Sequence, residues 1–268
     1  MNKVSIVMSA YNCAPLISEA INSIVNQTYK FWELIICDDR STDGTWDIIM
    51  MYKKIYPKEV FVLQNEKNRG RAYARNRCIK KARGSYIAIM DADDTCDPTR
   101  LEKQVEFLSS HPEISFVGTG MTFFDTNGTW ATRLMKSFPS KEDYIPNAPF
   151  CLASCMFRKD ALEAVGNYNE KPIYRSGEDY ELVVSLLEKG YRGANINELL
   201  YFCREDTEVY KKRKAKERIT EAWKLADIVT RLGLPVKYYI YILRPLFLAL
   251  LPGPLYMLIH RGFLKKNS

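Results

Sequence analysis

Three carboxylates follow directly on an apolar run in the middle of the chain. Residues 86–90 read Tyr-Ile-Ala-Ile-Met, and Asp91, Asp93 and Asp94 come immediately after them. Acids at this spacing suit a hard divalent cation, Mg²⁺ or Mn²⁺, which prefers oxygen ligands and usually accompanies a substrate diphosphate. The structural alternative is a helix cap with a turn, because Asp favours caps and Pro98 follows closely. A lone Asp-x-Asp does not separate these two interpretations.

Acids recur at two other places where an element is expected to end or begin. Asp39 follows the apolar run 34–37, and Glu178 and Asp179 follow Gly177 just before a helical stretch at 180–189. Such carboxylates can accept a hydrogen bond from a ligand or take a proton from a substrate. The alternatives are an Asx turn for Asp39 and a helix cap for the other two, which would stabilise the helix by about 0.5 to 2 kcal/mol.

Alternating apolar runs and helical patterns predict the elements that carry these acids. The sequence predicts strands at 4–9, 33–37, 60–63 and 86–90, and helices at 16–25, 46–55, 72–82 and 98–110. This alternation implies right-handed crossovers and a mainly parallel sheet, which is an α/β fold. Ligands of such sheets bind beyond the carboxyl ends of the strands, where Asp39 and Asp91 would emerge.

The second half of the chain is less regular. A strand is predicted at 114–124, followed by irregular structure around the prolines up to residue 149. A strand at 151–157, a short helix at 161–165, a strand at 195–203 and a long basic helix at 211–232 complete the prediction.

Composition excludes several classes of protein. A chain of 268 residues that is 47% hydrophobic can build a sizeable core. The seven cysteines are scattered and form no Cys-x-x-Cys pair, which argues against a disulfide framework and a zinc site. The chain opens on a strand-like segment without a signal-peptide pattern, so export is not expected. The net charge of +7 is concentrated late and fits nucleic acid, an anionic membrane or an anionic substrate.

The last thirty residues differ in kind from the rest. Residues 238–259 are nearly all apolar or aromatic, but Arg244 and three prolines interrupt them, and the longest uncharged run, 245–259, has only fifteen residues. A spanning helix needs about 20. We expect these residues to form an interfacial hairpin, and a buried core helix is the alternative. The tyrosines and basic residues of the hairpin would face the lipid headgroups: Tyr238, Tyr239, Tyr241, Tyr256, Lys237, His260, Arg261, Lys265 and Lys266.

Taken in order, five motifs resemble those of the inverting family 2 glycosyltransferases with the GT-A fold. They are residues 4–12, residues 33–45, Asn68-Arg69-Gly70 with Ala74-Arg75-Asn76, Asp91-Ala92-Asp93-Asp94, and Gly177-Glu178-Asp179. The resemblance covers residues 3 to about 206. It implies a Rossmann-like, mainly parallel nucleotide-binding sheet flanked by helices over residues 1–208. Residues 1–125 would bind the nucleotide-sugar and 126–208 the acceptor, and 209–268 would form a basic helix and a membrane-associating tail.

The resemblance also implies roles for individual residues in donor binding. Tyr11 would flank the base, and Asp39 would accept a hydrogen bond from the imide N–H of uracil. Arg75 could clamp phosphate, although a solvated helix face is the alternative for this arginine. Arg40 replaces the glycine common at that point in the family. The full donor set is Ser9, Ala10, Tyr11, Asn12, Asp39, Asn68, Arg75, Asp91, Ala92 and Arg204.

Metal binding and catalysis follow from the same resemblance. Asp93 would bind Mn²⁺ or Mg²⁺, with Asp91 nearby on the ribose side. The family often has a His soon after the Arg that matches Arg204, and this chain has Asp206, which could replace it as a ligand. Asp179 matches the catalytic base, with Glu178 as the fallback. The acceptor pocket could be lined by Phe150, Leu152, Met156 and Phe157.

The resulting hypothesis is an inverting glycosyltransferase that moves a sugar from a nucleotide-sugar, a UDP-sugar, to a lipid-linked saccharide acceptor. The setting would be surface polysaccharide synthesis (O-antigen, capsule or exopolysaccharide) at the cytoplasmic face of the bacterial inner membrane, without a nucleic acid partner. A dinucleotide oxidoreductase is disfavoured because no Gly-x-Gly-x-x-Gly follows the first strand. A sugar nucleotidyltransferase is disfavoured because the Gly-rich basic phosphate loop that it would need after the first strand is missing. A noncatalytic membrane-surface protein would leave the acids at three positions unexplained.

Overall fold

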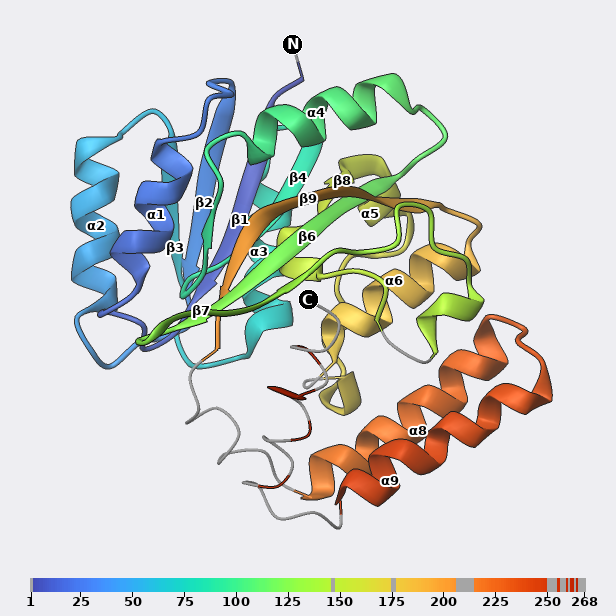
Figure 1. The fold of residues 1–268 in the computed structure, drawn as a ribbon. Coiled ribbons are helices and arrows are strands. Elements are labelled where there is room, and N and C mark those ends of the chain that lie inside the picture. Colours follow the sequence, from blue (N-terminus) through green and yellow to red (C-terminus); the bar gives the residue numbers. More distant parts are fainter. Residues whose placement is uncertain are drawn as a thin grey trace.

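One sheet of nine strands organises the computed structural model (Figure 1). The structure describes residues 2–145, 148–174, 177–205 and 215–249, together with residues 255, 259, 261, 262 and 264. The strands are β1 (Val4–Ala10), β2 (Trp32–Asp38), β3 (Val60–Gln64), β4 (Tyr86–Asp91), β5 (Thr95–Cys96), β6 (Phe116–Asp125), β7 (Gly128–Arg133), β8 (Met156–Arg158) and β9 (Gly193–Arg204).

Helices cover both faces of this sheet. They are α1 (Ile17–Val25), α2 (Thr45–Ile55), α3 (Arg71–Lys81), α4 (Arg100–Ser110), α5 (Lys159–Ala164), α6 (Glu178–Glu188) and α8 (Ala215–Arg231). A further helix, α9 (Leu243–Ala249), lies against α8. Short 3₁₀ turns are η1 (Glu142–Tyr144), η2 (Leu152–Ser154), η3 (Pro172–Tyr174) and η4 (Val236–Ile242).

Side chains alternate between the two faces along the central strand. Ile6 and Met8 pack with α1, α2 and α4, whereas Val7 between them packs with α3, α5, α6 and α8. This period of two is what a strand covered on both faces requires. The result is a three-layer α/β arrangement, with the sheet between two helical layers (Figure 1).

The sheet is mixed rather than mainly parallel, which corrects the prediction. Its order is β3-β2-β1-β4-β8-β6-β9-β5, with β7 added beside β6. Neighbours from β3 to β4 are all parallel, as their long helical crossovers require. β8 is antiparallel to both β4 and β6, β5 is antiparallel to β9, and only β6 and β9 are parallel in this half.

Three further predictions for the second half are corrected by the structure. The segment after residue 125 is not irregular throughout, because β6 and β7 form a hairpin that closes at Asp125 and Gly128, and Gly128 has φ +105°. The strand predicted at 151–157 is confined to β8. The four residues expected in the acceptor pocket are instead buried in the core: Phe150, Leu152, Met156 and Phe157. The rings of residues 150 and 157 pack on Phe116.

The helix α8 is anchored to α6. Its Ile228 and Val229 are buried in the same core cluster as Leu182 of α6. Arg231 adds ion pairs to α6, at 3.2 Å from Glu181 and 2.7 Å from the carboxylate of Glu188. The end of α8 therefore belongs to the layer of helices that covers the sheet.

Beyond α8 the described residues leave an apolar surface open to solvent. Exposed side chains include Val236, Ile240, Leu243 and Phe247, so the alternative of a buried core helix is not met in η4 and α9. Among the residues that the structure describes, no helix is both long and apolar enough to cross a bilayer. Tyr256, His260, Lys265 and Lys266 of the predicted lipid-facing set lie outside the described residues.

The end of the described chain returns to the β6–β7 hairpin. Arg261 pairs with Asp125 at 3.1 Å and lies over the ring of Trp130, with 4.4 Å between the guanidinium carbon and the ring centre. Leu264 is buried with Met121 and Phe123. Arg261 was predicted to face anionic lipid, and this is wrong, because a carboxylate and an indole ring of the protein hold its guanidinium.

Candidate active site

A cavity of about 300 Å³ opens at the carboxyl ends of β1, β2 and β4. Parallel strands bring their ends to one edge of the sheet, and the register pairs Ser9 with Asp91 on one side and with Cys37 on the other. Predicted site residues that line the cavity are Ser9, Ala10, Tyr11, Asp39, Asp91, Ala92 and Asp93. Cys13 and Arg71 also line it, and sequence analysis did not select them.

Asp39 fixes the loop that leads into α3. Its Oδ1 accepts hydrogen bonds from the Asn65 side chain at 2.6 Å and from the Arg69 N–H at 2.9 Å. Its Oδ2 accepts the Gly70 N–H at 2.7 Å. The carboxylate thus joins the ends of β2 and β3, and Oδ2, with one hydrogen bond, keeps the capacity to accept a second.

The loops after β1 and β2 are tied to each other. Asn12 donates its backbone N–H to Ser41 Oγ at 3.0 Å, and its side-chain oxygen accepts the Thr42 N–H at 2.8 Å. Arg40 takes a left-handed conformation with φ +65°, a backbone shape that glycine adopts without strain. This turn is therefore formed with an arginine at a position where a glycine would fit without strain.

The three carboxylates after β4 form a compact oxygen cluster. One oxygen from each of Asp91, Asp93 and Asp94 lies within 4.8 Å of the others. Burial, and then the neighbouring negative charges, raise the pKa of Asp93 and of Asp94. Crowded like charges of this kind are relieved by a divalent cation, so the donor set fits Mg²⁺ or Mn²⁺. Asp93 is the exposed member of the cluster.

Asp94 is not a helix cap. Its two oxygens accept the Tyr201 hydroxyl at 2.8 Å and the Arg204 N–H at 2.7 Å, which ties the loop after β4 to β9. The turn before α4 is made by Asp97 instead, whose Oδ1 accepts the N–H and the hydroxyl of Thr99.

Arg75 lies beneath the cavity and joins two of the acids. The side chain is fully buried, so the alternative of a solvated helix face is wrong. Its Nη2 donates to Asp91 and its Nη1 to Asp179, both at 2.6 Å. Although burial opposes ionisation of Asp91, the charges of Arg75 and Arg71 outweigh it and lower the pKa of that carboxyl.

The two acids at the start of α6 differ in access. The Glu178 side chain is 1% exposed and lies 2.9 Å from Nε of Arg71. The Asp179 side chain is 32% exposed, and burial of the group raises its pKa against the opposing charge of Arg75. Arg71 and Arg75 are four residues apart on α3, so one helix face meets both acids. Sequence analysis missed Arg71, although this spacing from Arg75 was a signal that could have found it.

Arg204 lies at the end of β9, beside the acidic cluster. Its Nη2 pairs with Glu19 of α1 at 2.6 Å, its Nε donates to the Asp93 carbonyl at 3.3 Å, and its guanidinium lies over the Phe124 ring. Of the remaining predicted residues, Asn68 is exposed on the loop between β3 and α3 and does not line the cavity. Asp206 lies outside the described residues.

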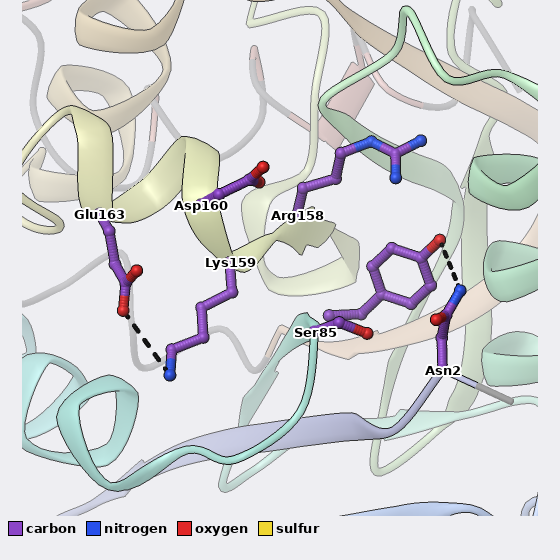
Figure 2. A pocket seen from close by; sticks show the side chains of 7 residues that line it. Asn2, Ser85, Arg158, Lys159, Asp160 and Glu163 are labelled. Carbon is purple, nitrogen blue, oxygen red and sulfur yellow. Dashed lines mark hydrogen bonds and ion pairs between the residues drawn. The ribbon is translucent and has the colours of Figure 1, made fainter.

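A second cavity, of about 380 Å³, lies where β4 begins, at the opposite end of that strand (Figure 2). Several of its polar side chains are engaged with the protein itself. Asn2 donates to the Tyr86 hydroxyl at 3.2 Å, and Lys159 lies 3.6 Å from the carboxylate of Glu163. Arg158 donates to backbone carbonyls near the end of α4. This cavity shows no group set apart for a ligand, and we do not assign it to the site.

Comparison with family models gives two matches. The model of glycosyl transferase family 2 matches residues 5–166, and that of glycosyl transferase family group 2 matches residues 86–260. Together they span the acidic cluster, both arginines of α3 and the start of α6.

Relatives and solved structures agree with these matches. EpsE of Bacillus subtilis strain 168, provisionally named as a glycosyltransferase, is 40% identical over 97% of this chain and 93% of its own. The Escherichia coli UDP-Glc:alpha-D-GlcNAc-diphosphoundecaprenol beta-1,3-glucosyltransferase WfaP is 33% identical over 85% and 87%.

Two solved structures share the fold at low identity. S. aureus TarS 1-349 in complex with UDP-GlcNAc is 19% identical, with a TM-score of 0.70 over 99% of this chain and 74% of that one. The mannosyltransferase PcManGT from Pyrobaculum calidifontis, in complex with GDP-Man and Mn²⁺, is 20% identical, with a TM-score of 0.63 over 97% and 73%. The architecture described above is therefore the GT-A arrangement of these enzymes.

Proposed function

The chain belongs to glycosyl transferase family 2 and is a glycosyltransferase, and on that premise we propose that it transfers a sugar from a UDP-sugar to a lipid-linked saccharide, with inversion at the anomeric carbon. One observation carries the proposal. The cavity beyond the strands is flanked by an acidic cluster suited to a cation, and the accessible carboxylate of Asp179 is joined to that cluster through Arg75.

The donor nucleotide would lie in the cavity between the ends of β1, β2 and β4. Tyr11 is 49% exposed at the cavity wall and offers a ring face to the base. Asp39 Oδ2 carries one hydrogen bond and can accept a second from an imide N–H, which supports uracil as the base. UDP-GlcNAc in TarS and the UDP-Glc in the name of WfaP agree with this choice.

The metal site of the proposal uses the acidic cluster. Asp93 would hold Mn²⁺ or Mg²⁺, with Asp91 beside it, and Asp94 would brace the loop through Tyr201 and Arg204. A bound cation would neutralise charge on the departing diphosphate. Mn²⁺ in the PcManGT complex supports a divalent ion of this kind.

Asp179 would act as the base of a single displacement. As the acceptor hydroxyl oxygen forms a bond to the anomeric carbon, the bond from that carbon to the diphosphate oxygen breaks, and UDP leaves with the bonding electrons. The hydroxyl proton passes to the Asp179 carboxylate. The greater exposure of Asp179, and the pairing of the buried Glu178 with Arg71, favour Asp179 over Glu178 in this role.

The acceptor and the location form the last part of the proposal. The diphosphoundecaprenol acceptor in the name of WfaP supports a lipid-linked saccharide and a place in surface polysaccharide synthesis. The exposed apolar side chains of η4 and α9, with Lys237 and Arg244 among them, suit the interface of an anionic bilayer. The protein would work as a peripheral or monotopic enzyme at the cytoplasmic face of the inner membrane.

The test is a screen of nucleotide-sugars for Mn²⁺-dependent transfer to a membrane-extracted polyprenyl diphosphosaccharide. We expect a UDP-sugar to serve as donor, and Asp179→Asn to lower turnover at least about 10²-fold while UDP still binds. Asp160→Asn, an exposed acid of α5 beside the second cavity, is the matched control and should keep wild-type turnover. A wild-type turnover for Asp179→Asn would refute the assignment of the base.

A further inference from the structure

A single buried guanidinium connects the donor side of the site to the proposed base. Arg75 has no exposed surface, and its two terminal nitrogens donate to different carboxylates. The Asp91 and Asp179 side chains that it joins are 24% and 32% exposed, so both reach the surface of the site while the cation stays below. The three groups form a fixed chain from the end of β4 to the start of α6.

The surroundings of Arg75 leave it little freedom to move. The Tyr168 ring lies behind it, 5.2 Å from the guanidinium carbon to the ring centre. Tyr168 is itself held by Asn76, which accepts its N–H at 2.9 Å and donates to its carbonyl at 2.8 Å. A cation this deeply buried is costly unless carboxylates pair with it, and here only Asp91 and Asp179 do so at ion-pair distance among the described residues.

The planar fork of an arginine suits this task. Its nitrogens stand at fixed angles, so the two carboxylates are held at a set separation, whereas a lysine would offer one mobile ammonium. Arg71 makes a contrasting contact one turn earlier, because its side chain is 56% exposed and its ion pair among the described residues is with Glu178. Arg71 thus fixes the start of α6, and Arg75 fixes the carboxylate that faces the acceptor.

We propose that Arg75 is a positioning residue of the transfer reaction: by holding Asp179 to Asp91 through one rigid guanidinium, it sets where the base stands relative to the anomeric carbon of the donor. This inference rests on the proposed function. Misplacing a catalytic group by about 1 Å costs on the order of 10²-fold in rate, so the effect belongs in kcat rather than in donor binding.

The first experiment compares Arg75→Lys with the wild-type protein. We expect kcat to fall about 10²-fold, while the donor KM and the calorimetric Kd for UDP with Mn²⁺ change less than about threefold. Arg158→Lys is the matched control. That arginine also donates to several groups, but its hydrogen bonds go to the backbone carbonyls of Leu108, His111 and Ile114, near the end of α4 and away from the site. It should lower Tm and leave kcat per folded molecule unchanged.

A double-mutant cycle separates positioning from a general loss of structure. If Arg75 acts through the base, Arg75→Lys should not slow the residual reaction of Asp179→Asn any further. The inference would be overturned if the losses in kcat of the two single variants multiplied in the double variant, or if Arg75→Lys kept the wild-type kcat. If Arg75→Lys does not fold, Tyr168→Leu decides instead, because it keeps both ion pairs and removes the ring behind them. We expect about a tenfold fall in kcat, absent in the Asp179→Asn background.

Failure of the inference and failure of the proposed function give different results. A wild-type protein without transfer activity on any nucleotide-sugar would refute the function and the role of Arg75 together. An active wild-type protein whose Arg75→Lys variant keeps its kcat would refute the role of Arg75 alone.

Discussion

Arg204 and Glu19 form an ion pair at 2.6 Å that joins the end of β9 to the first turn of α1. The Arg204 side chain is 13% exposed and the Glu19 side chain 59%, so the carboxylate is the solvated partner. The family resemblance placed Arg204 in the donor-binding set. If its guanidinium meets the donor diphosphate, Glu19 competes with that diphosphate for the same cation.

Glu19→Gln should therefore tighten the binding of UDP. Exposed ion pairs are worth about 0.2 to 1 kcal/mol, so we expect a Kd roughly 1.5 to 5 times lower, with the gain shrinking at high salt. Isothermal titration calorimetry at two salt concentrations measures it. Glu163→Gln, which removes the partner of Lys159 beside the second cavity, should leave the Kd unchanged. Weaker UDP binding by Glu19→Gln would count against a diphosphate role for Arg204.

Metal binding should be visible as thermal stabilisation. Burial, and then the neighbouring like charges, raise the pKa of Asp93 and Asp94, so a divalent cation would relieve the repulsion in the folded state. A ligand at 100 times its Kd adds about 2.7 kcal/mol, so Mn²⁺ with UDP should raise Tm by several degrees, and EDTA should reverse the rise. Asp93→Asn should lose the rise in Tm. Asp47→Asn, which changes an exposed residue of α2, should keep it. An equal shift in both variants would place the metal elsewhere.

Glu33 should make stability depend on acid pH. Its carboxylate is 1% exposed and lies 2.8 Å from Lys3 and 2.7 Å from Arg83. Burial opposes ionisation, but the hydrogen bonds from Lys3, Ser5 and Arg83 outweigh it and lower the pKa of Glu33 from 4.5 to about 2. Since the folded-state pKa is the lower one, the stabilisation is present above pH 4.5 and is lost as the pH falls toward 2.

A difference of this size corresponds to about 3 kcal/mol. Glu33→Gln should lower the free energy of unfolding by about 2 to 4 kcal/mol at pH 7, and flatten its dependence on pH between 4.5 and 2. Urea unfolding across that range measures both. Glu106→Gln, an exposed acid on α4, should change neither. Equal pH profiles for Glu33→Gln and the wild-type protein would contradict the assigned pKa.

The membrane proposal is best tested with point variants of the exposed apolar surface. Ile240 and Phe247 are 66% and 64% exposed, and each buried apolar side chain contributes about 1.5 to 3 kcal/mol. Replacing both with serine should weaken binding to vesicles of anionic phospholipid at least about tenfold in a sedimentation assay. Ile55→Ser, at a 56% exposed site on α2, is the control. Truncation is less clean, because Arg261 and Leu264 pack on the β6–β7 hairpin.

The sequence predicted the half of the fold in which local signals agree. β1 to β4 are apolar runs separated by segments with helical periodicity. Because these strands are parallel, the polar residues that follow them reach one edge of the sheet. That is why Asp39, Asp91 and Asp93 were found to line one cavity. The sequence pattern was weaker at β7, whose side chains are mostly exposed or half-buried, although Asn127-Gly128 is a hairpin signal.

Contacts between distant residues were beyond the sequence. Arg75 and Asp179 are 104 positions apart, and neither spacing nor periodicity relates them. The same holds for Arg261, which local composition assigned to lipid and which Asp125 and Trp130 hold in the structure. Phe150 and Phe157 were expected to line the acceptor pocket because their segment is apolar and lies near the predicted acceptor site. In the structure both are buried in the core.

The strand order also determines when the site can form. β1, β2, β3 and β4 pair among themselves, so this half of the sheet can form first, whereas Asp94 takes its place only after Tyr201 and Arg204 of β9 have been synthesised. The second carboxylate partner of Arg75, Asp179, lies 104 residues further along the chain, on helix α6 after β8. Non-local contacts of this span form slowly. An early half-sheet would therefore hold Arg75 with Asp91 as its partner but without Asp179, and competence for transfer would mark the last stage of folding.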